Sequence, residues 1–401
     1  MSNGLAGAGW PLIATEELRW QPAATFALPS GQARLQAGPY RAAIAPEIAT
    51  VPDVPLSAET RSLVTEAATE IARFDAEVGA DLAPFSAILL RTESVASSRI
   101  ENLTASAKAI ALAELGDTDR ANATVIVANT TAMQAAIALA DRLGGDAILA
   151  MHRALLGTTE PEWAGKWRTV QNWIGGSDWS PHRAMFVPPH PDRVPAAIHD
   201  LERFLVRDDL PVLVQAAVAH AQFETIHPFP DGNGRTGRAL VHSLLRGKGL
   251  TRKVTVPVSA GLLADTSSYF DALTAYRDGD PEPIVERLAS ASFAAINNGR
   301  TLVGDLHALR ASWDDTISAR RGASAWRLAD LVLSQPVVDS PLAQRQLAVT
   351  APAALRAIEQ LVDAGVLTKM SGRQRYRRYS ASQVLEALDA FAVRAGRRGG
   401  S

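Results

Sequence analysis

Residues 227–238, His-Pro-Phe-Pro-Asp-Gly-Asn-Gly-Arg-Thr-Gly-Arg, form a polar segment that interrupts two runs with helical spacing. Residues before it that would share one helix face recur every three residues, at Ala217, His220, Phe223 and Ile226. Residues after it give a second helical run, at Ala239, Leu240, Leu244 and Leu245. This order predicts two packed helices joined by a short loop. The loop is therefore expected to be held rigidly between them.

The chain has 401 residues, more than one hydrophobic core usually accommodates, so two or three domains are expected. Its formal net charge of -2 gives no global basic field, so nucleic-acid binding would have to come from a local patch. Cysteine is absent, which excludes disulfides and thiolate metal sites and suits a reducing cytosol. The N-terminus lacks a signal-peptide pattern, and polar residues interrupt the most apolar stretch, near 125–140. We therefore expect a cytoplasmic protein with no membrane partner.

Helical periodicity dominates residues 57–320, whereas prolines punctuate residues 20–55 and disfavour long helices there. A stretch at 161–189 differs, because tryptophans lie among glycines and prolines. Within it, residues 169–171 and 185–187 are predicted strands of a β-hairpin or extended loop. We predict four parts: an N-terminal region at 1–84, a helical core at 85–300, a linker helix at 301–321 and a C-terminal unit at 322–395.

The C-terminal unit has the order of a winged-helix domain. Helices at 326–333, 341–347 and 351–364 precede a hairpin, and a last helix follows Ser380. Basic residues lie on the hairpin and on the third helix, at Lys369, Arg373, Arg375, Arg377, Arg378 and Arg356. One interpretation is contact with DNA phosphates, and the other is a module for protein interaction or homodimerisation. Few polar residues on the third helix suit base edges, so both interpretations stay open.

The residue types of the central loop suit an anion site. Gly232 and Gly234, on either side of Asn233, allow a backbone path that points successive N–H groups inward. A helix begins there, and its N-terminus favours negative charge. Arg235 and Arg238 lie three residues apart on that helix, and guanidinium groups bind phosphate oxygens with paired hydrogen bonds.

Two further side chains of the loop suit group transfer. Asp231 offers a hard oxygen ligand for the Mg²⁺ that accompanies a nucleoside triphosphate. His227 carries a side chain suited to take a proton from a hydroxyl nucleophile. Each feature alone is commonly a packed turn or a solvated face. Their combination within twelve residues predicts a site that binds a nucleotide polyphosphate.

The pattern His-x-Phe-x-Asp/Glu-Gly-Asn-Gly-Arg-x-x-Arg resembles the motif of the Fic (filamentation induced by cyclic AMP) domain, and every defined position is filled here. The resemblance covers roughly residues 85–300. It implies a mainly α fold, a Fic-type helical bundle with a small β-hairpin flap, here followed by a winged helix-turn-helix domain. Most members transfer AMP from ATP to a Ser, Thr or Tyr hydroxyl of a target protein. The implied roles are a general base at His227, Mg²⁺ binding by Asp231, phosphate binding by Gly232, Asn233, Gly234 and Arg235, and γ-phosphate binding by Arg238.

Residues 97–102, Ser-Ser-Arg-Ile-Glu-Asn, resemble the inhibitory motif of the same family, Ser/Thr-x-x-x-Glu-Gly/Asn. The resemblance implies an inhibitory helix at about 92–104, with Ser97 and Glu101 as its motif residues. A Glu101 carboxylate paired with Arg238 would occupy the charge and space meant for the γ-phosphate. ATP would then bind with a misaligned α-phosphate. Without the Fic motif, Glu101 would be interpreted as an exposed helix carboxylate.

Tyr269 and Phe270 resemble the aromatic pair near the adenine pocket of the family, but Asp265-Thr266 stands where Asn-Arg is common. We predict a Mg²⁺- and ATP-dependent protein adenylyltransferase that modifies a target protein or itself and is inhibited by Glu101. Two alternatives stay open: a winged-helix DNA-binding regulator with a ligand-sensing Fic portion, and a Fic enzyme that transfers UMP, phosphate or phosphocholine. An intact His227 favours an enzyme, because a sensor has no need of a base.

Overall fold

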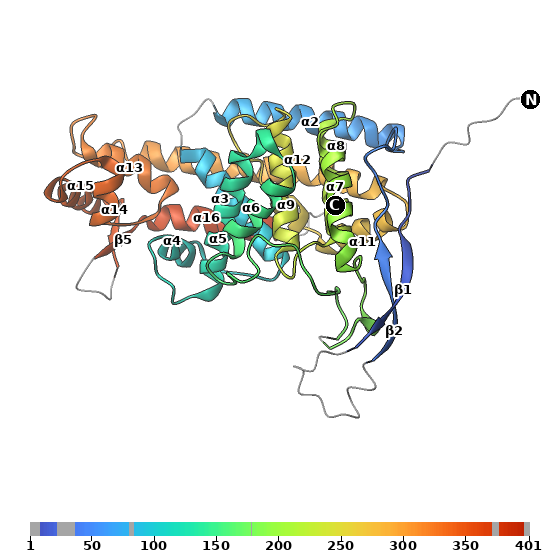
Figure 1. The fold of residues 1–401 in the computed structure, drawn as a ribbon. Coiled ribbons are helices and arrows are strands. Elements are labelled where there is room, and N and C mark those ends of the chain that lie inside the picture. The colour runs from blue at the N-terminus through green and yellow to red at the C-terminus, as the bar shows by residue number, and fades with distance from the viewer. Residues whose placement is uncertain (1–8, 22–36, 80–83, 178, 371–376, 397–401) are drawn as a thin grey trace, which may run out of the picture. The chain divides into compact units, whose positions relative to one another are not determined.

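The computed structural model describes residues 9–21, 37–79, 84–177, 179–370 and 377–396, and most of them are helical (Figure 1). The helices before the central loop are α2 (Ala58–Gly79), α3 (Pro84–Ile100), α4 (Ala107–Glu114), α5 (Ala121–Ala138), α6 (Gly145–Leu156), α7 (Val194–Leu205) and α8 (Val212–Ile226). Those after it are α9 (Asn233–Gly247), α10 (Val258–Leu263), α11 (Thr266–Arg277), α12 (Glu282–Ser312), α13 (Ser324–Ser334), α14 (Ser340–Leu347), α15 (Ala351–Asp363) and α16 (Ser382–Ala395). The mainly α class is confirmed. Among the helices that the structure describes, none has both the length and the apolar run that a bilayer crossing needs.

Short 3₁₀ turns and five strands complete the described secondary structure. The turns are η1 (Ala140–Arg142), η2 (Pro181–Arg183) and η3 (Pro191–Arg193). The strands are β1 (Ala14–Trp20), β2 (Gly38–Ile44), β3 (Val337–Asp339), β4 (Thr368–Lys369) and β5 (Arg378–Ser380).

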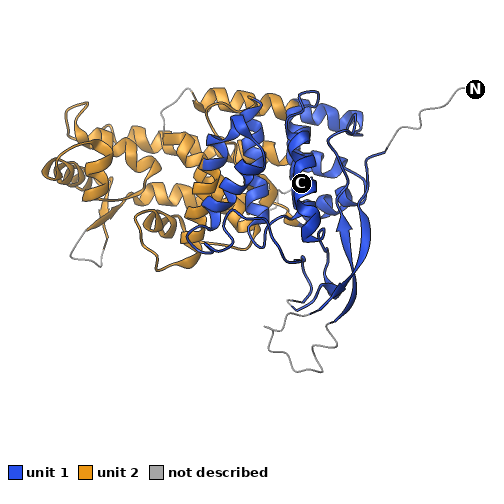
Figure 2. Cartoon of the chain, in the orientation of Figure 1, with its two compact units in different colours: residues 1–65, 135–248, 267–289 blue, residues 66–134, 249–266, 290–401 orange. Residues whose placement is uncertain are grey.

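The chain forms two compact units, each assembled from separate stretches of sequence (Figure 2). Unit 1 consists of residues 1–65, 135–248 and 267–289. Unit 2 consists of residues 66–134, 249–266 and 290–401. The central loop therefore belongs to unit 1, whereas the predicted inhibitory helix and the winged-helix region belong to unit 2. The linear division into four parts stays a prediction.

A β-hairpin that the sequence analysis did not predict lies in unit 1. Strands β1 and β2 pair antiparallel along their whole length, from Ala14 opposite Ile44 to Trp20 opposite Gly38. The absence of long helices from the described residues here agrees with the prolines of this segment, but the two strands were not predicted. Pro39 is tolerated because it is the second residue of β2, near the strand end.

Among the described residues of the predicted hairpin at 161–189, there is no continuous strand ladder. These residues pair at two isolated bridges, Ile174 with Phe186 and Ser177 with Ser180. The predicted strand at 169–171 is wrong, and the strand predicted at 185–187 is reduced to the single bridge at Phe186. This segment is hydrogen-bonded to the β1–β2 hairpin instead: the N–H of Ala43 donates to the Val187 carbonyl at 2.9 Å. The stretch is thus an extended loop.

Helices α8 and α9 pack against each other in unit 1 and flank residues 227–232. Almost all of α8 is buried because α7 packs against it as well. Phe223 and Ile226, near its end, are fully buried. On α9, the Ser243 hydroxyl donates to the Ala136 carbonyl at 2.9 Å. The prediction of two packed helices around one loop is confirmed.

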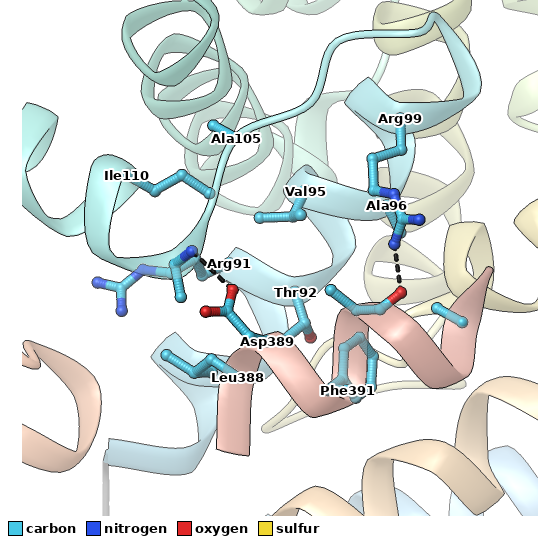
Figure 3. A pocket seen from close by; sticks show the side chains of 13 residues that line it. Arg91, Thr92, Val95, Ala96, Arg99, Ala105, Ile110, Leu388, Asp389 and Phe391 are labelled. Carbon is cyan, nitrogen blue, oxygen red and sulfur yellow. Dashed lines mark hydrogen bonds between the residues drawn. The ribbon is translucent and has the colours of Figure 1, made fainter. Parts of the chain in front are cut away.

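Helix α3 packs against α10, α13 and α16 within unit 2. The guanidinium of Arg99 donates to the Ala392 carbonyl on α16, and the Asp389 carboxylate accepts from the Ala107 N–H at 2.9 Å (Figure 3). The cavity beside these contacts measures about 30 Å³, which is room for one or two waters rather than for an organic ligand. Helix α16 is therefore packed closely against α3 and α4.

The winged-helix prediction is confirmed for residues 324–380. Helices α13, α14 and α15 are followed by the β4–β5 hairpin, and the sheet has the order β3-β5-β4. Strand β3 was not predicted because it is only three residues long. Arg373 and Arg375 of the predicted basic hairpin lie outside the described residues. Arg378 forms a salt bridge with Asp117, so its charge is already paired within unit 2.

Candidate active site

His227 ends α8 in a left-handed backbone conformation, with φ 49° and ψ 59°. Its N–H donates to the Phe223 carbonyl at 2.8 Å, which closes the last turn of the helix. This conformation costs a non-glycine residue on the order of 1–2 kcal/mol, so surrounding contacts have to hold it. The side chain of His227 is 18% exposed, which leaves part of the imidazole accessible to a substrate.

Arg168 supplies those contacts. Its side chain is buried, its Nε donates to the His227 carbonyl at 2.9 Å, and another nitrogen donates to the Pro189 carbonyl. Its backbone N–H donates to the Pro228 carbonyl at 2.9 Å. Burial lowers the pKa of Arg168 to about 10, so it remains charged at neutral pH. The sequence analysis missed this residue, because nothing in the local pattern around Arg168 shows that it lies beside the loop.

Phe229 anchors the middle of the loop. Its N–H donates to Asn233 Oδ1 at 2.9 Å, and Asn233 Nδ2 donates back to the Phe229 carbonyl at 2.8 Å. Asn172 Nδ2 donates to the same carbonyl at 2.9 Å. The Asn233 amide is thus used inside the loop. A contact between Asn233 and phosphate would come through its backbone N–H.

His152, on α6, also contacts this loop. Its ring stacks on Phe229, with centroids 3.6 Å apart and an interplanar angle of 1°. Its Nδ1 accepts from the Gly165 N–H at 2.9 Å, so Nε2 carries the hydrogen and donates to the Asp231 carbonyl at 3.0 Å. Burial lowers the pKa of His152 to about 4, and the ring is neutral at pH 7. The sequence analysis did not single out His152.

Gly232 turns the chain into α9. Its φ is +78°, a conformation that favours glycine, and a Cβ at this position would also crowd Leu155 Cδ2 at 2.9 Å. Helix α9 begins at Asn233, which places Gly234 in its first turn. Gly232 occupies the N-cap position of α9 and, having no side chain, cannot cap the N–H groups of the first turn. The first-turn N–H groups of α9 therefore form the type of helix end that binds anions.

The two arginines of the motif are buried, not solvated. Arg235 is 5% exposed and Arg238 is 3% exposed. One nitrogen of Arg235 donates to Asp231 Oδ2 at 3.0 Å. Its Nε and its other terminal nitrogen are buried without a hydrogen-bond partner among the described residues. A buried cation with unused donors is costly unless an anion completes it.

Asp231 is the residue that would hold a metal. In the described part of the chain, no three His, Asp or Glu side chains converge on one point. Mg²⁺ bound to a nucleotide needs only one or two protein carboxylates, because phosphates and waters supply its other ligands. The Asp231 side chain is 59% exposed and fits that requirement. Mg²⁺ binding by Asp231 stays a prediction.

Glu224 is a second residue that the sequence analysis missed. It lies one helical turn before His227, and its Oε2 is 3.7 Å from His227 Nδ1. Burial acts to raise its pKa, but the neighbouring His227 side chain and the charges of His220 and Arg238 lower it to about 2. The side chain is therefore a buried carboxylate at neutral pH. The helical spacing of three residues between Glu224 and His227 is the signal that could have revealed it.

The predicted aromatic pair is divided between the core and the surface. Tyr269 is 1% exposed, and its hydroxyl lies 2.8 Å from His220 Nε2. Phe270 is 49% exposed. Their rings lie 5.1 Å apart. A role in adenine binding stays a prediction for both, and Phe270 offers the accessible face.

The predicted inhibitory residues lie at the C-terminal end of α3. Ser97 is fully buried in the last turn, and α3 ends at Ile100. Glu101 is exposed in the turn that follows. Asn102 has φ 61°, a left-handed conformation that asparagine adopts more readily than most residues. The motif therefore coincides with a defined helix end.

Residues 143–245 match the Fic/DOC family, and residues 326–380 match an HTH DNA binding domain. The chain is 32% identical over 159 residues to protein adenylyltransferase fic-1 of Caenorhabditis elegans, covering 39% of this chain and 28% of that protein. It is also 32% identical over 148 residues to protein adenylyltransferase Fic of Drosophila erecta, covering 36% and 27%. The chain thus spans less than a third of the length of these curated relatives.

A solved structure shows the same fold over most of the chain. The Fic family protein of Desulfovibrio desulfuricans G20 aligns with a TM-score of 0.54 and 22% identity. The alignment covers 82% of this chain and 98% of that structure. This likeness shows a shared fold, and the match of residues 143–245 to the Fic/DOC family shows that the chain contains a Fic domain. It is a Fic domain protein with a winged helix-turn-helix domain near its C-terminus.

Proposed function

We propose that this protein is a Mg²⁺- and ATP-dependent protein adenylyltransferase. One observation carries the proposal: Arg235 is buried with unused donors in the first turn of α9, in the same sequence motif as His227. A polyphosphate would supply the missing acceptors and lie beside a base. The two relatives named above are described as protein adenylyltransferases, which supports the same reaction.

In the proposed reaction, a hydroxyl of a target protein attacks the α-phosphorus of ATP. A new O–P bond forms, the bond between the α-phosphorus and the bridging oxygen breaks, and pyrophosphate leaves. His227 takes the hydroxyl proton, while the N–H groups of the first turn of α9, Arg235 and Arg238 hold the phosphates. Bound at Asp231, Mg²⁺ would neutralise phosphate charge and help align the leaving group.

The target hydroxyl would belong to a Ser, Thr or Tyr of another protein or of this chain. The extended loop at 161–189 is the surface that we propose for docking it. Among the described residues of this loop, four large hydrophobic side chains are exposed: Trp163 by 47%, Val170 by 64%, Trp179 by 42% and Met185 by 86%. An extended peptide can contact such a surface through its main chain and its side chains.

We also propose that Glu101 inhibits this reaction by pairing with Arg238 in place of the γ-phosphate. The support is the motif that contains Ser97 and Glu101 and its position at the end of α3. A carboxylate satisfies a guanidinium with the same geometry as a phosphate, so the two compete. ATP held without its γ-phosphate contact would be poorly aligned for in-line attack.

The test uses the Glu101→Gly variant, incubated with Mg²⁺ and ATP labelled at the α-phosphate in a cell lysate. We expect labelled protein bands well above those of the wild type, and mass spectrometry should find AMP on a hydroxyl side chain. The double variant Glu101→Gly with His227→Ala sets the background, and Glu101→Gln tests removal of the charge alone. Label from γ-phosphate but not from α-phosphate would indicate phosphate transfer instead, and no label from any nucleotide would overturn the enzyme assignment.

DNA binding is a second candidate function, favoured by the match of residues 326–380 to an HTH DNA binding domain. Arg356 on α15, Lys369 on β4 and Arg377 before β5 are exposed and would contact phosphates. The exposed face of α15 also carries Glu359 and Asp363, which repel DNA. Fluorescence anisotropy with labelled duplex DNA at several salt concentrations measures whether the protein binds DNA and whether that binding depends on salt. Binding that does not weaken as salt rises would reject phosphate contact.

A further inference from the structure

The buried carboxylate of Glu224 faces the proposed base from its own helix. Glu224 and His227 are three residues apart, and the left-handed turn at His227 leaves Glu224 Oε2 3.7 Å from His227 Nδ1. The Glu224 side chain is 8% exposed. Its Oε1 has no hydrogen-bond partner among the described residues, and neither does His227 Nδ1. A buried acceptor and a buried ring nitrogen therefore lie together with unused hydrogen-bonding capacity.

The space for this carboxylate is made by a glycine of the loop motif. A Cβ at Gly237 would lie 2.9 Å from Glu224 Oε1 and 3.1 Å from His220 Nδ1. An alanine there would displace the carboxylate or push α9 away from α8. Gly237 therefore permits α9 to pack closely over Glu224. This accounts for a glycine in the middle of a helix, where it is otherwise unfavourable.

The electrostatic surroundings keep Glu224 ionised. His220 lies on the preceding turn of α8, Arg238 on α9 and Arg277 on α11, and each contributes to the charge around Glu224. An anion next to Nδ1 favours the imidazole tautomer with hydrogen on Nδ1 and stabilises the ring when it becomes protonated. The separation of 3.7 Å exceeds a hydrogen bond, but such contacts are often long before substrate binds.

We propose that Glu224 is a positioning residue for His227: its carboxylate accepts a hydrogen bond from Nδ1–H and leaves Nε2 facing the attacking hydroxyl. The proton of that hydroxyl goes to Nε2, Nδ1 keeps its own hydrogen, and the carboxylate stays ionised. The positive ring formed in this step is stabilised by the adjacent negative charge. This inference rests on the proposed function, because it assigns a role within that reaction.

The contrasting explanation is that Glu224 only neutralises Arg238 and stabilises the fold. The two explanations differ in what a neutral side chain of the same shape would do. In Glu224→Gln, loss of positioning would lower kcat with little change in KM for ATP. Loss of charge balance around Arg238 would instead change KM for ATP, because Arg238 would hold a phosphate.

The experiment compares Glu224→Gln and Glu224→Asp in the active Glu101→Gly background. We expect Glu224→Gln to lower kcat about 10- to 100-fold with KM for ATP changed less than two-fold, and Glu224→Asp to keep part of the rate. Thr225→Val is the matched control, since Thr225 is buried on the same turn and its hydroxyl donates a hydrogen bond to the Ala221 carbonyl at 2.8 Å. It should leave kcat unchanged.

A second measurement does not depend on catalysis. Nitrogen chemical shifts of ¹⁵N-histidine-labelled protein report which ring nitrogen carries hydrogen, and His227→Ala assigns the signal. We expect the Nδ1–H tautomer of His227 in the parent and its loss in Glu224→Gln. An unchanged kcat, an unchanged tautomer, or an effect confined to KM would overturn the inference. If the Glu101→Gly parent transfers no AMP, the proposed function fails, and the tautomer still decides whether Glu224 orients His227.

Discussion

The Nε of Arg168 donates a hydrogen bond to the carbonyl oxygen of His227 at 2.9 Å, so a buried cation holds the backbone of the proposed base. The two residues are 59 positions apart in the sequence. The same guanidinium also contacts the carbonyls of Val170 and Pro189, which both belong to the extended loop. The loop proposed to receive the target and the proposed base are therefore anchored to one side chain.

Replacement of Arg168 tests this anchoring. Arg168→Met keeps the length of the side chain but removes every donor, leaving several buried carbonyls unsatisfied. We expect the free energy of unfolding to fall by about 2–4 kcal/mol and kcat in the Glu101→Gly background to fall with it. Thermal denaturation and an assay of AMP transfer measure the two effects. Arg183→Met, at an exposed position of the same loop, is the control and should change neither.

Removal of the imidazole tests the base. His227→Ala in the Glu101→Gly background should lower AMP transfer by about 10²- to 10⁴-fold, because no other group takes the hydroxyl proton. Binding of ATP, measured by calorimetry, should remain within a few-fold of the parent, because the phosphates contact α9 and the arginines instead. Full transfer by His227→Ala would show that the base assignment is wrong.

Arg235 provides a test of the phosphate site. Its Nε and one terminal nitrogen have no hydrogen-bond partner among the described residues. We therefore expect the side chain to contribute to ATP binding more than to the stability of the ATP-free protein. Arg235→Ala should weaken ATP binding by roughly 10- to 100-fold, the loss of one charge-assisted contact. The melting temperature without ATP should not fall, since a buried cation with unused donors is removed. Arg142→Ala, at an exposed position, is the control, and equal ATP affinity in the two variants would contradict the assignment.

The pH dependence of stability tests the neutral state of His152. Its folded pKa of about 4 lies below the usual value of 6.5, so the unfolded chain binds a proton more readily than the folded protein. The stabilisation is complete above pH 6.5 and is lost as pH falls toward 4, by up to about 3 kcal/mol. Melting temperatures in buffer without Mg²⁺ should fall less steeply over this range in His152→Gln. His199→Gln, whose side chain is 73% exposed, should follow the wild type.

Deletion of residues 322–401 tests whether the winged-helix region is needed to fold unit 2. Val337 and Leu385 pack with Ala111 of α4 in one buried cluster. Helix α16 also accepts a hydrogen bond from Arg99 of α3 (Figure 3). Each large apolar side chain that loses its partner costs about 1.5–3 kcal/mol. We expect a lower melting temperature and a broader transition for the truncated protein, by calorimetry. A truncated protein that melts like the full chain would show that α3 folds without this region, and Gln360→Ala on the exposed face of α15 is the control.

The loop of the proposed site and its two flanking helices could be predicted from local sequence. The periodicity on either side of residues 227–238 predicted α8 and α9, because residues three and four apart share one helix face. Gly232 was predicted at a turn, and its φ of +78° favours a glycine. The winged helix was predictable for the same reason, since its helices and turns each have a local signature. The β1–β2 hairpin was not, because strand pairing depends on a partner elsewhere in the chain.

The sequence by itself determined the residue types of the loop, the helices that flank it and the family to which the domain belongs. Only the tertiary structure decided that the motif arginines are buried, that the Asn233 amide is used within the loop, and that Arg168, His152 and Glu224 surround it. Arg168 and His152 come from segments far from the loop, while Glu224 lies on a helix whose faces are nearly all buried. Burial, charge and hydrogen-bond partners depend on which segments come into contact in the folded protein, and local sequence patterns do not predict those contacts.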